Sequence, residues 1–234
     1  MNISDFVDIL DDGMPHFDFI MFDACFMMSV EVAYEVRNYT DYYIGSPTEN
    51  PGPGAPYDKV VPYMFKPGAA AQMAEAYFNH YKDNYKAGEG ISNANWTGGT
   101  SICAVRTDAL DDLADVTGQL LERADNESMP SFNTVFDYDK RDMEEGHVGY
   151  YDFSQMMEMR LDADAYVAWK NVFDASIVYW NTTDKNYSMF KRMFSMKGTN
   201  GITHYIPLSV DSKAAEAYRS MAWYKAAGLE NMGW

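Results

Sequence analysis

The chain has 234 residues, enough to bury a sizeable core as one large domain or two small ones. Hydrophobic residues make up 47% of it and charged residues 23%, a composition typical of globular proteins and not of disordered or fibrous ones. Its net charge of −17 repels phosphate backbones and no compact basic patch is visible, so we expect no nucleic-acid partner. No uninterrupted apolar run approaches the roughly 20 residues of a membrane span, and the first residues lack the pattern of a signal peptide.

The first part of the chain alternates elements in the manner of an α/β fold. A short helix is expected around residues 4–10, and the apolar run at 17–22 is typical of a strand that is buried on both faces. Helical spacing over 27–36 and a second apolar stretch at 42–44 complete a strand–helix–strand unit.

A loop dense in proline and glycine covers residues 45–56, beyond the second predicted strand, where α/β sheets commonly place their sites. The later patterns predict helices at 69–81, 110–124, 152–161, 165–180 and 214–227, and strands at 101–105 and 201–207. We divide the chain into a core over 1–124 and a helical C-terminal extension over 125–234. The extension contains the returning strand Gly201–Pro207 and the closing helix.

Cys25 is the first candidate for chemistry. It lies between the first predicted strand and the next helix, so its sulfur is expected near a helix N-terminus and near backbone N–H groups that stabilise a thiolate and an oxyanion. The alternative is a buried structural cysteine, the commoner role of a lone cysteine. Cys103 lies inside a predicted strand, and we interpret it as structural.

Asp23 is unusual because it ends an apolar strand, where an unpaired carboxylate is costly. On the pleat of the strand it shares a face with Cys25, so one hypothesis is that it lines a pocket floor and selects a cationic side chain. The other is that it caps the following helix. The residues alone leave both open.

Taken together, these residues resemble the clostripain family of cysteine peptidases, which share the caspase–gingipain fold. The most specific part is the Asp-Ala-Cys stretch over 22–27, with the Ser-Pro-Thr-Glu motif over 45–49 and the segment 54–57. The resemblance continues through 102–113, 203–207 and 222–225, and so covers essentially the whole chain. It implies an α/β caspase-like sheet with flanking helices.

The resemblance also implies a function, a cysteine endopeptidase that cleaves after arginine or lysine. The residue matching the nucleophile is Cys25, and the carboxylate matching the one that binds the basic P1 side chain is Asp23. The loop that starts at Ser46 is expected to form one wall of the P1 pocket, where Glu49 and Asp58 would add negative potential. Basic peptides or proteins are therefore the expected substrates.

One departure from the family concerns the general base, which in the family is a histidine followed by glycine, upstream of the cysteine strand. The only histidine before Cys25 is His16, which precedes the strand itself and is followed by Phe17. None of the later histidines matches either: these are His80, His147 and His204. We therefore expect this chain to lack the first strands of the core, and the histidine to come from an upstream light chain or segment. The alternative is a catalytically inactive homologue that binds basic peptides or a partner protein.

A cluster of acids has oxygen ligands that suit Ca²⁺, and calcium dependence occurs in the family. Its members are Asp137, Asp139, Asp142, Glu144 and Glu145. Their spacing does not match an EF-hand, so a solvated acidic loop is the alternative, and no other cofactor is expected. A secreted, periplasmic or cell-surface location is implied by the family alone.

Overall fold

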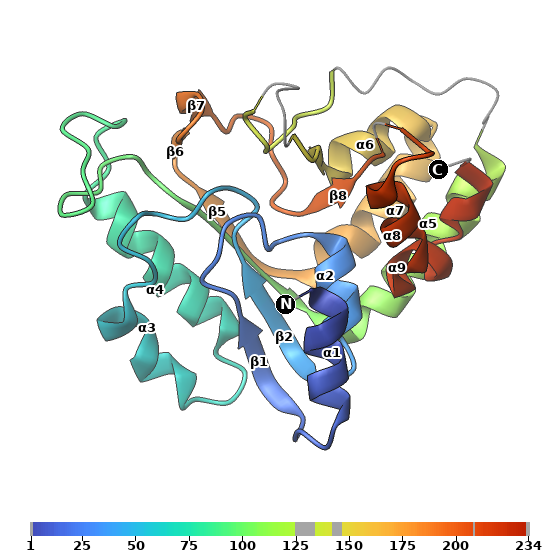
Figure 1. Cartoon of the computed structure of the whole chain (residues 1–234), viewed down its shortest axis with the longest axis horizontal. Helices are drawn as coiled ribbons and strands as arrows, with labels where there is room; N and C mark the ends of the chain where they lie inside the picture. Colours follow the sequence, from blue (N-terminus) through green and yellow to red (C-terminus); the bar gives the residue numbers. More distant parts are fainter. Residues whose placement is uncertain (1, 125–133, 142–146, 208, 233–234) are drawn as a thin grey trace.

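A mixed four-stranded sheet lies at the centre of the computed structural model, in the order β1-β2-β3-β5 (Figure 1). Its strands are β1 (Phe17–Met21), β2 (Thr40–Gly45), β3 (Ser101–Arg106) and β5 (Ile177–Thr182). Strand β1 runs parallel to β2, whereas β3 is antiparallel to both of its neighbours. The structure describes residues 2–124, 134–141, 147–207 and 209–232.

Helices cover both faces of this sheet (Figure 1). One face carries α3 (Tyr57–Met64) and α4 (Ala70–Asp83). The other carries α1 (Ile3–Asp11), α2 (Val30–Val36), α5 (Leu110–Arg123) and α7 (Ala163–Ser176). Successive strand side chains point to opposite faces, so Ile102 packs under α4 while Cys103 packs in the opposite core. The expected architecture, a sheet with flanking helices, is confirmed.

The strand–helix–strand unit expected near the N-terminus is confirmed as β1-α2-β2. Ser29 caps α2, because its hydroxyl accepts a hydrogen bond from the N–H of Val32 at 3.2 Å. Strand β1, however, is not buried on both faces as expected: Asp18 is exposed and the other residues are half-buried. The reason is its place at the edge, since among the described strands β1 pairs with β2 alone.

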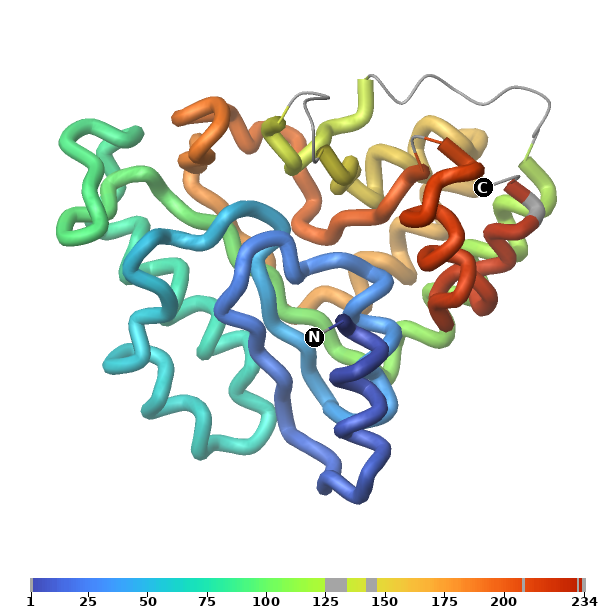
Figure 2. The backbone as a smooth tube through the Cα atoms, in the orientation of Figure 1, coloured from blue at the N-terminus to red at the C-terminus, as the bar shows by residue number. Residues whose placement is uncertain are grey.

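The prediction of a helix over 165–180 is wrong at its C-terminal end. Helix α7 stops at Ser176, and Ile177 begins β5, which pairs with β3 (Figure 2). The segment Ile-Val-Tyr-Trp is β-branched and aromatic, and its packing in the sheet outweighs the helical spacing that continues from α7. Because β5 completes the sheet, the division at residue 124 does not coincide with a division of the sheet.

The last third of the chain adds short elements around one end of the sheet. They are β4 (Tyr150–Asp152), α6 (Phe153–Arg160), β6 (Lys185–Ser188), β7 (Arg192–Ser195), β8 (Thr203–Tyr205), α8 (Lys213–Ser220) and α9 (Ala222–Ala226). The returning strand is present as β8, but it pairs with β4 and not with the central sheet. The single closing helix expected over 214–227 is two helices, since Met221 is extended between them.

None of the helices in the described residues is both long enough and apolar enough to cross a bilayer.

Candidate active site

The chain turns sharply after β1, and the exposed side chain of Cys25 lies at this turn. The next residue, Phe26, has φ 60°, a left-handed conformation that aromatic residues rarely adopt. Two contacts hold it there: its N–H donates to the carbonyl oxygen of Thr48 at 3.0 Å, and its ring stacks on Tyr150 at 5.1 Å. Helix α2 begins only at Val30, so the thiol lies on a fixed turn and not at the helix N-terminus that we expected.

Asn50 connects the thiol to the carboxylate of Asp23. Its backbone N–H donates to Sγ of Cys25 at 3.2 Å, and its side-chain Nδ2 donates to Oδ1 of Asp23 at 3.1 Å. Its Oδ1 is buried and accepts no hydrogen bond from any described residue. The site therefore brings together a thiol, a carboxylate and an unused carbonyl acceptor beside that carboxylate.

The second oxygen of Asp23 is held by the loop that follows β2. It accepts hydrogen bonds from the N–H of Ala55 at 2.8 Å and from the hydroxyl of Tyr57 at 3.4 Å. Gly54 lies close beside it with φ +79°, and a Cβ at Gly54 would come within 3.0 Å of that oxygen. Asp23 does not cap α2, since Ser29 does. Of the two hypotheses for Asp23, the helix cap is wrong.

Two tyrosines of α4 lie behind this loop. The hydroxyl of Tyr81 donates to the carbonyl oxygen of Gly54. Burial, and secondarily the charge of Asp23, raises the pKa of Tyr81 to about 12. Burial also raises the pKa of Tyr77 well above its usual value, with Tyr81 and Asp23 contributing. Both phenols are therefore neutral at physiological pH, which leaves Asp23 as the acid of this group of residues.

Ser46 lies in the interior, with 1% of its surface exposed. Its hydroxyl is within hydrogen-bonding distance of Ser101 at 3.2 Å and accepts from the N–H of Thr48 at 3.2 Å. Ser46 therefore supports the loop from its buried side and does not lie on the exposed surface of the loop.

Glu49 and Asp58, the two further acids expected here, point to different partners. Both oxygens of Glu49 accept hydrogen bonds from the turn between β6 and β7, through Ser188 and Met189. Asp58 is exposed in the first turn of α3 and pairs with Lys59 at 2.9 Å. A hydrogen bond from Lys59 lowers the pKa of Asp58. No hydrogen bond joins either acid to Asp23 or to Cys25 among the described residues, and Asp23 is the acid that lies next to the thiol.

Comparison with known proteins identifies the family of this chain. The model of the clostripain family, the C11 peptidases, matches residues 1–231. The chain belongs to the clostripain family. Comparison with curated proteins found no match.

Solved structures of clostripain-family proteases are similar to this chain over nearly all of its length. A cysteine protease from Bacteroides fragilis is 37% identical with a TM-score of 0.90, and the match covers 100% of this chain and 96% of that one. A secreted C11 protease from Bacteroides thetaiotaomicron, in complex with an irreversible peptide inhibitor, is 39% identical with a TM-score of 0.88. An inactive zymogen from Parabacteroides distasonis is 28% identical with a TM-score of 0.81. The match covers 98% and 97% of this chain but only 64% and 62% of the second and third relatives.

All four histidines of this clostripain-family chain lie in its described part, and none of them contacts the thiol through a hydrogen bond there. His16 pairs with Asp41 at 2.8 Å, and His147 lies 2.5 Å from Asp137. His80 packs edge-on against Tyr81. His204 is fully buried, accepts from the indole N–H of Trp223 at 3.1 Å, and has its pKa lowered by burial to about 3. Within the described part of the chain, no histidine is hydrogen-bonded to Cys25.

The acid cluster proposed for calcium is only partly described, because Asp142, Glu144 and Glu145 lie outside the described residues. The carboxylate of Asp137 contacts His147 and accepts a hydrogen bond from the N–H of Tyr150. The carboxylate of Asp139 pairs with Arg141 and accepts a hydrogen bond from the N–H of Val148. Within the described residues, no group of three potential metal ligands is present.

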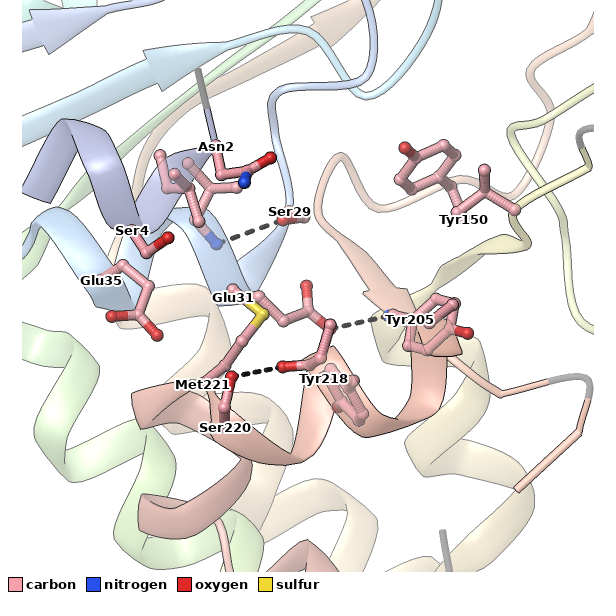
Figure 3. Close-up of a pocket in the computed structure, with 15 residues that line it drawn as sticks. Asn2, Ser4, Ser29, Glu31, Glu35, Tyr150, Tyr205, Tyr218, Ser220 and Met221 are labelled. Atoms are coloured by element: carbon pink, nitrogen blue, oxygen red, sulfur yellow. Dashed lines mark hydrogen bonds between the residues drawn. The ribbon is translucent and has the colours of Figure 1, made fainter. Parts of the chain in front are cut away.

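A hollow of about 700 Å³ lies apart from the thiol, between α2, α8 and the first residues of the chain (Figure 3). Glu31 reaches into it from α2 and accepts a hydrogen bond from the N–H of Tyr205 at 2.7 Å. Burial raises the pKa of Glu31 to about 7. His204 lies 3.8 Å away. The sequence analysis did not identify this acid, because its burial depends on β8, which is far away along the chain.

Asn50 is a further site residue that its sequence position did not reveal. The residue stands next to the Ser-Pro-Thr-Glu motif, which was the available clue. Its role depends on how the loop folds back over Cys25, and spacing along the chain does not encode that path.

Proposed function

We propose that this chain carries the nucleophile and the P1 pocket of a cysteine endopeptidase that cleaves after arginine or lysine. The observation that carries the proposal is Asn50, which joins the exposed thiol of Cys25 to the carboxylate of Asp23. A cationic P1 side chain paired with Asp23 would bring the carbonyl carbon that follows it next to Sγ. The Asp23 carboxylate suits a substrate group with several N–H donors, such as guanidinium or ammonium.

In the proposed reaction Sγ attacks the carbonyl carbon, the C–N bond breaks, and the amine leaves with a proton. Water then hydrolyses the thioester. The chemistry uses a thiol and a base and requires no cofactor. We infer that the base is a histidine of a segment that pairs with the edge of β1 left unpaired among the described strands, because no histidine of this chain is hydrogen-bonded to Cys25 within the described residues. A secreted relative that is 39% identical supports export of the protein.

The second candidate function is a homologue that binds basic peptides without cleaving them. The same distribution of histidines favours it, since a chain without a base beside its thiol would retain the pocket for cationic side chains and lose turnover.

The test is labelling with a thiol-directed peptide inhibitor that has arginine at P1, read by intact mass. One label is expected, at Cys25, because Cys103 is fully buried and burial raises its pKa well above the usual range. Cys25→Ala should abolish labelling. Asp23→Asn should slow it about 100-fold, and should leave labelling by iodoacetamide, which has no P1 group, within about twofold.

If Asp23→Asn slows labelling by both reagents equally, the variant has disturbed the thiol itself. That result would contradict the proposed role of Asp23 in binding the P1 side chain. A labelled chain that cleaves no arginine peptide, even with a histidine-bearing segment of a relative added, would favour the binding protein over the enzyme.

A further inference from the structure

The turn between β6 and β7 exposes two large apolar side chains near the site. Met189 is 77% exposed and Phe190 is 53% exposed. Exposed apolar side chains are ordinary when they are scattered singly, but two adjacent ones on a turn that is fixed in place form a contact surface. We call Met189 and Phe190 the apolar tip.

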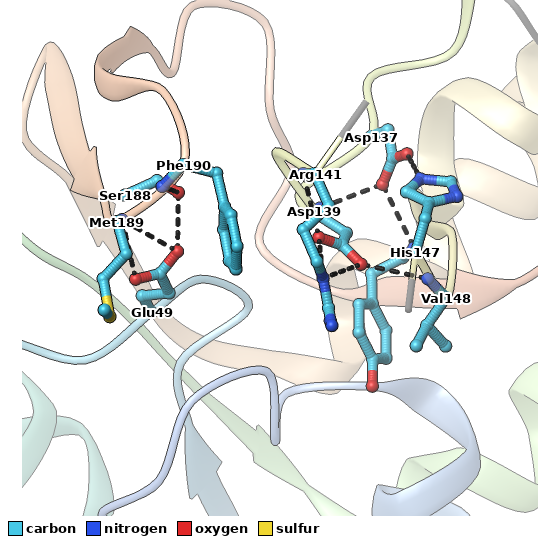
Figure 4. A network of polar contacts seen from close by, with 10 residues as sticks. Glu49, Asp137, Asp139, Arg141, His147, Val148, Ser188, Met189 and Phe190 are labelled. Carbon is cyan, nitrogen blue, oxygen red and sulfur yellow. Dashed lines mark hydrogen bonds and ion pairs between the residues drawn. The ribbon is translucent and has the colours of Figure 1, made fainter. Parts of the chain in front are cut away.

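The apolar tip is fixed to the loop that holds the thiol and Asp23. The hydroxyl of Ser188 donates to Glu49 at 2.6 Å, and the N–H of Met189 donates to the same carboxylate at 3.1 Å (Figure 4). The ring of Phe190 lies between Glu49 and Arg141, with the guanidinium 5.5 Å from the ring centre. Both oxygens of Glu49 are used in this way, so Glu49 positions the tip.

The distance from the thiol to the tip is a few residues of extended peptide. Glu49 precedes Asn50, one Cα step of about 3.8 Å, and its side chain and a hydrogen bond of about 3 Å then reach Met189. The sum is roughly 10 Å, and an extended chain rises about 3.3 Å per residue. Because this path is an upper limit on the straight distance, the Met189 nitrogen lies within about three extended residues of Asn50.

The tip also lies on the same wall as the P1 pocket. Asn50, Ala55 and Tyr57, which hold Asp23, belong to the loop that Glu49 joins to the tip. A peptide that leaves the pocket along this wall with its N-terminal part toward the tip presents the residues that precede P1 there.

We propose that Met189 and Phe190 form an apolar subsite for substrate side chains at P3 and P4, held in place by Glu49. This subsite rests on the proposed function, because it is defined relative to an arginine or lysine at P1. The preferred substrate is then a basic residue preceded, two or three positions earlier, by leucine, valine or an aromatic residue.

The test is equilibrium binding of fluorescent peptides to the Cys25→Ala chain, read by anisotropy. One peptide has leucine at P4 and P3 and arginine at P1, a second has glutamine at P4 and P3, and a third has glutamine in place of arginine. The leucine peptide should bind about tenfold more tightly than its glutamine counterpart, since two apolar side chains leave water.

Met189→Ser and Phe190→Ser should each reduce that ratio to about two or three, with little effect on the glutamine peptide. Glu49→Gln should reduce the ratio in the same way, through the position of the tip. Phe65→Ser is the matched control, because Phe65 is an 83% exposed aromatic residue at the far end of α3. It should leave the ratio unchanged.

Equal binding of the leucine and glutamine peptides, both of them lost when arginine is replaced, would overturn the subsite and leave the P1 pocket intact. Binding that ignores the arginine would overturn the proposed function, and the subsite with it.

Discussion

At the scale of single residues, the site depends on one loop folding back over one turn. Asn50 contacts both Cys25 and Asp23, so the position of the carboxylate relative to the sulfur is set by a single side chain and its own backbone. Gly54 makes the other half of the cradle, because only a residue without a side chain leaves room beside Asp23 at this φ.

Gly54→Ala is expected to weaken binding of an arginine peptide about tenfold. The new Cβ would come within 3.0 Å of Oδ2 of Asp23, and the carboxylate must move to relieve the contact. The φ of +79° adds a backbone cost of about 1 kcal/mol to the free energy of folding. Peptide anisotropy and urea unfolding measure the two effects separately.

Gly13→Ala is the control for this prediction. Gly13 has φ +85° with no atom within 4 Å of a new Cβ, so it carries the backbone cost alone. Similar losses of peptide binding in both variants would mean that the effect comes from the backbone and not from the cradle.

At the scale of elements, β8 joins the C-terminal part of the chain to the segment that follows the thiol. The N–H of Thr203 donates to the carbonyl oxygen of Met28 at 3.0 Å, and the N–H of Tyr205 donates to Glu31. Helix α2 is therefore fixed at its start by a strand that lies more than 170 residues later.

Glu31→Gln should stabilise the chain relative to wild type as the pH rises. The raised pKa of Glu31 means that its protonated form is favoured by folding, so its contribution is full below pH 4.5 and is lost as the pH rises through about 7. Glutamine stays neutral and still accepts from the N–H of Tyr205. The difference in unfolding free energy between variant and wild type should shift by up to about 3 kcal/mol between pH 5 and pH 8.

Urea unfolding of both proteins across that pH range measures the shift. The other titrating groups are the same in both proteins, so most of their contributions cancel in the difference in unfolding free energy. A difference that stays constant with pH would show that Glu31 ionises alike in the folded and unfolded chain.

The elements with a clear periodicity were predictable from the sequence, and those set by distant partners were not. Helix α5 has leucines at helical spacing, and β3 is an apolar run, so both were found with nearly correct bounds. Strand β5 was not separated from α7, because its strand character comes from pairing with β3. In the same way, Cys25 and Asp23 could be proposed as site residues from their place after a strand, whereas Asn50 and the apolar tip needed the folded loop.

At the scale of the whole molecule, the sheet ends on one side in β1, which is paired on one edge only among the described strands. Open strand edges pair with other chains, and charged side chains are a common protection against this. Asp18, the second residue of β1, is exposed and is suited to that role.

The chain alone is expected to associate as its concentration rises, and Asp18→Asn should associate at lower concentration than wild type. Light scattering across a concentration series measures this. Glu122→Gln on the exposed surface of α5 removes the same charge far from the sheet edge and should behave as wild type. A wild-type chain that stays monomeric throughout would count against an open, pairing-competent edge.

The hydrogen bonds between Glu49 and the β6–β7 turn also bear on the order in which the molecule forms during synthesis. Their partners lie about 140 residues apart in the chain. A nascent chain has made Cys25, Asp23 and Asn50 well over 100 residues before it makes Ser188, so the loop over Cys25 at first lacks this anchor. We expect that loop to take its final place only after the β6–β7 turn has left the ribosome, which ties the exposed thiol's surroundings to one of the last parts of the fold to form.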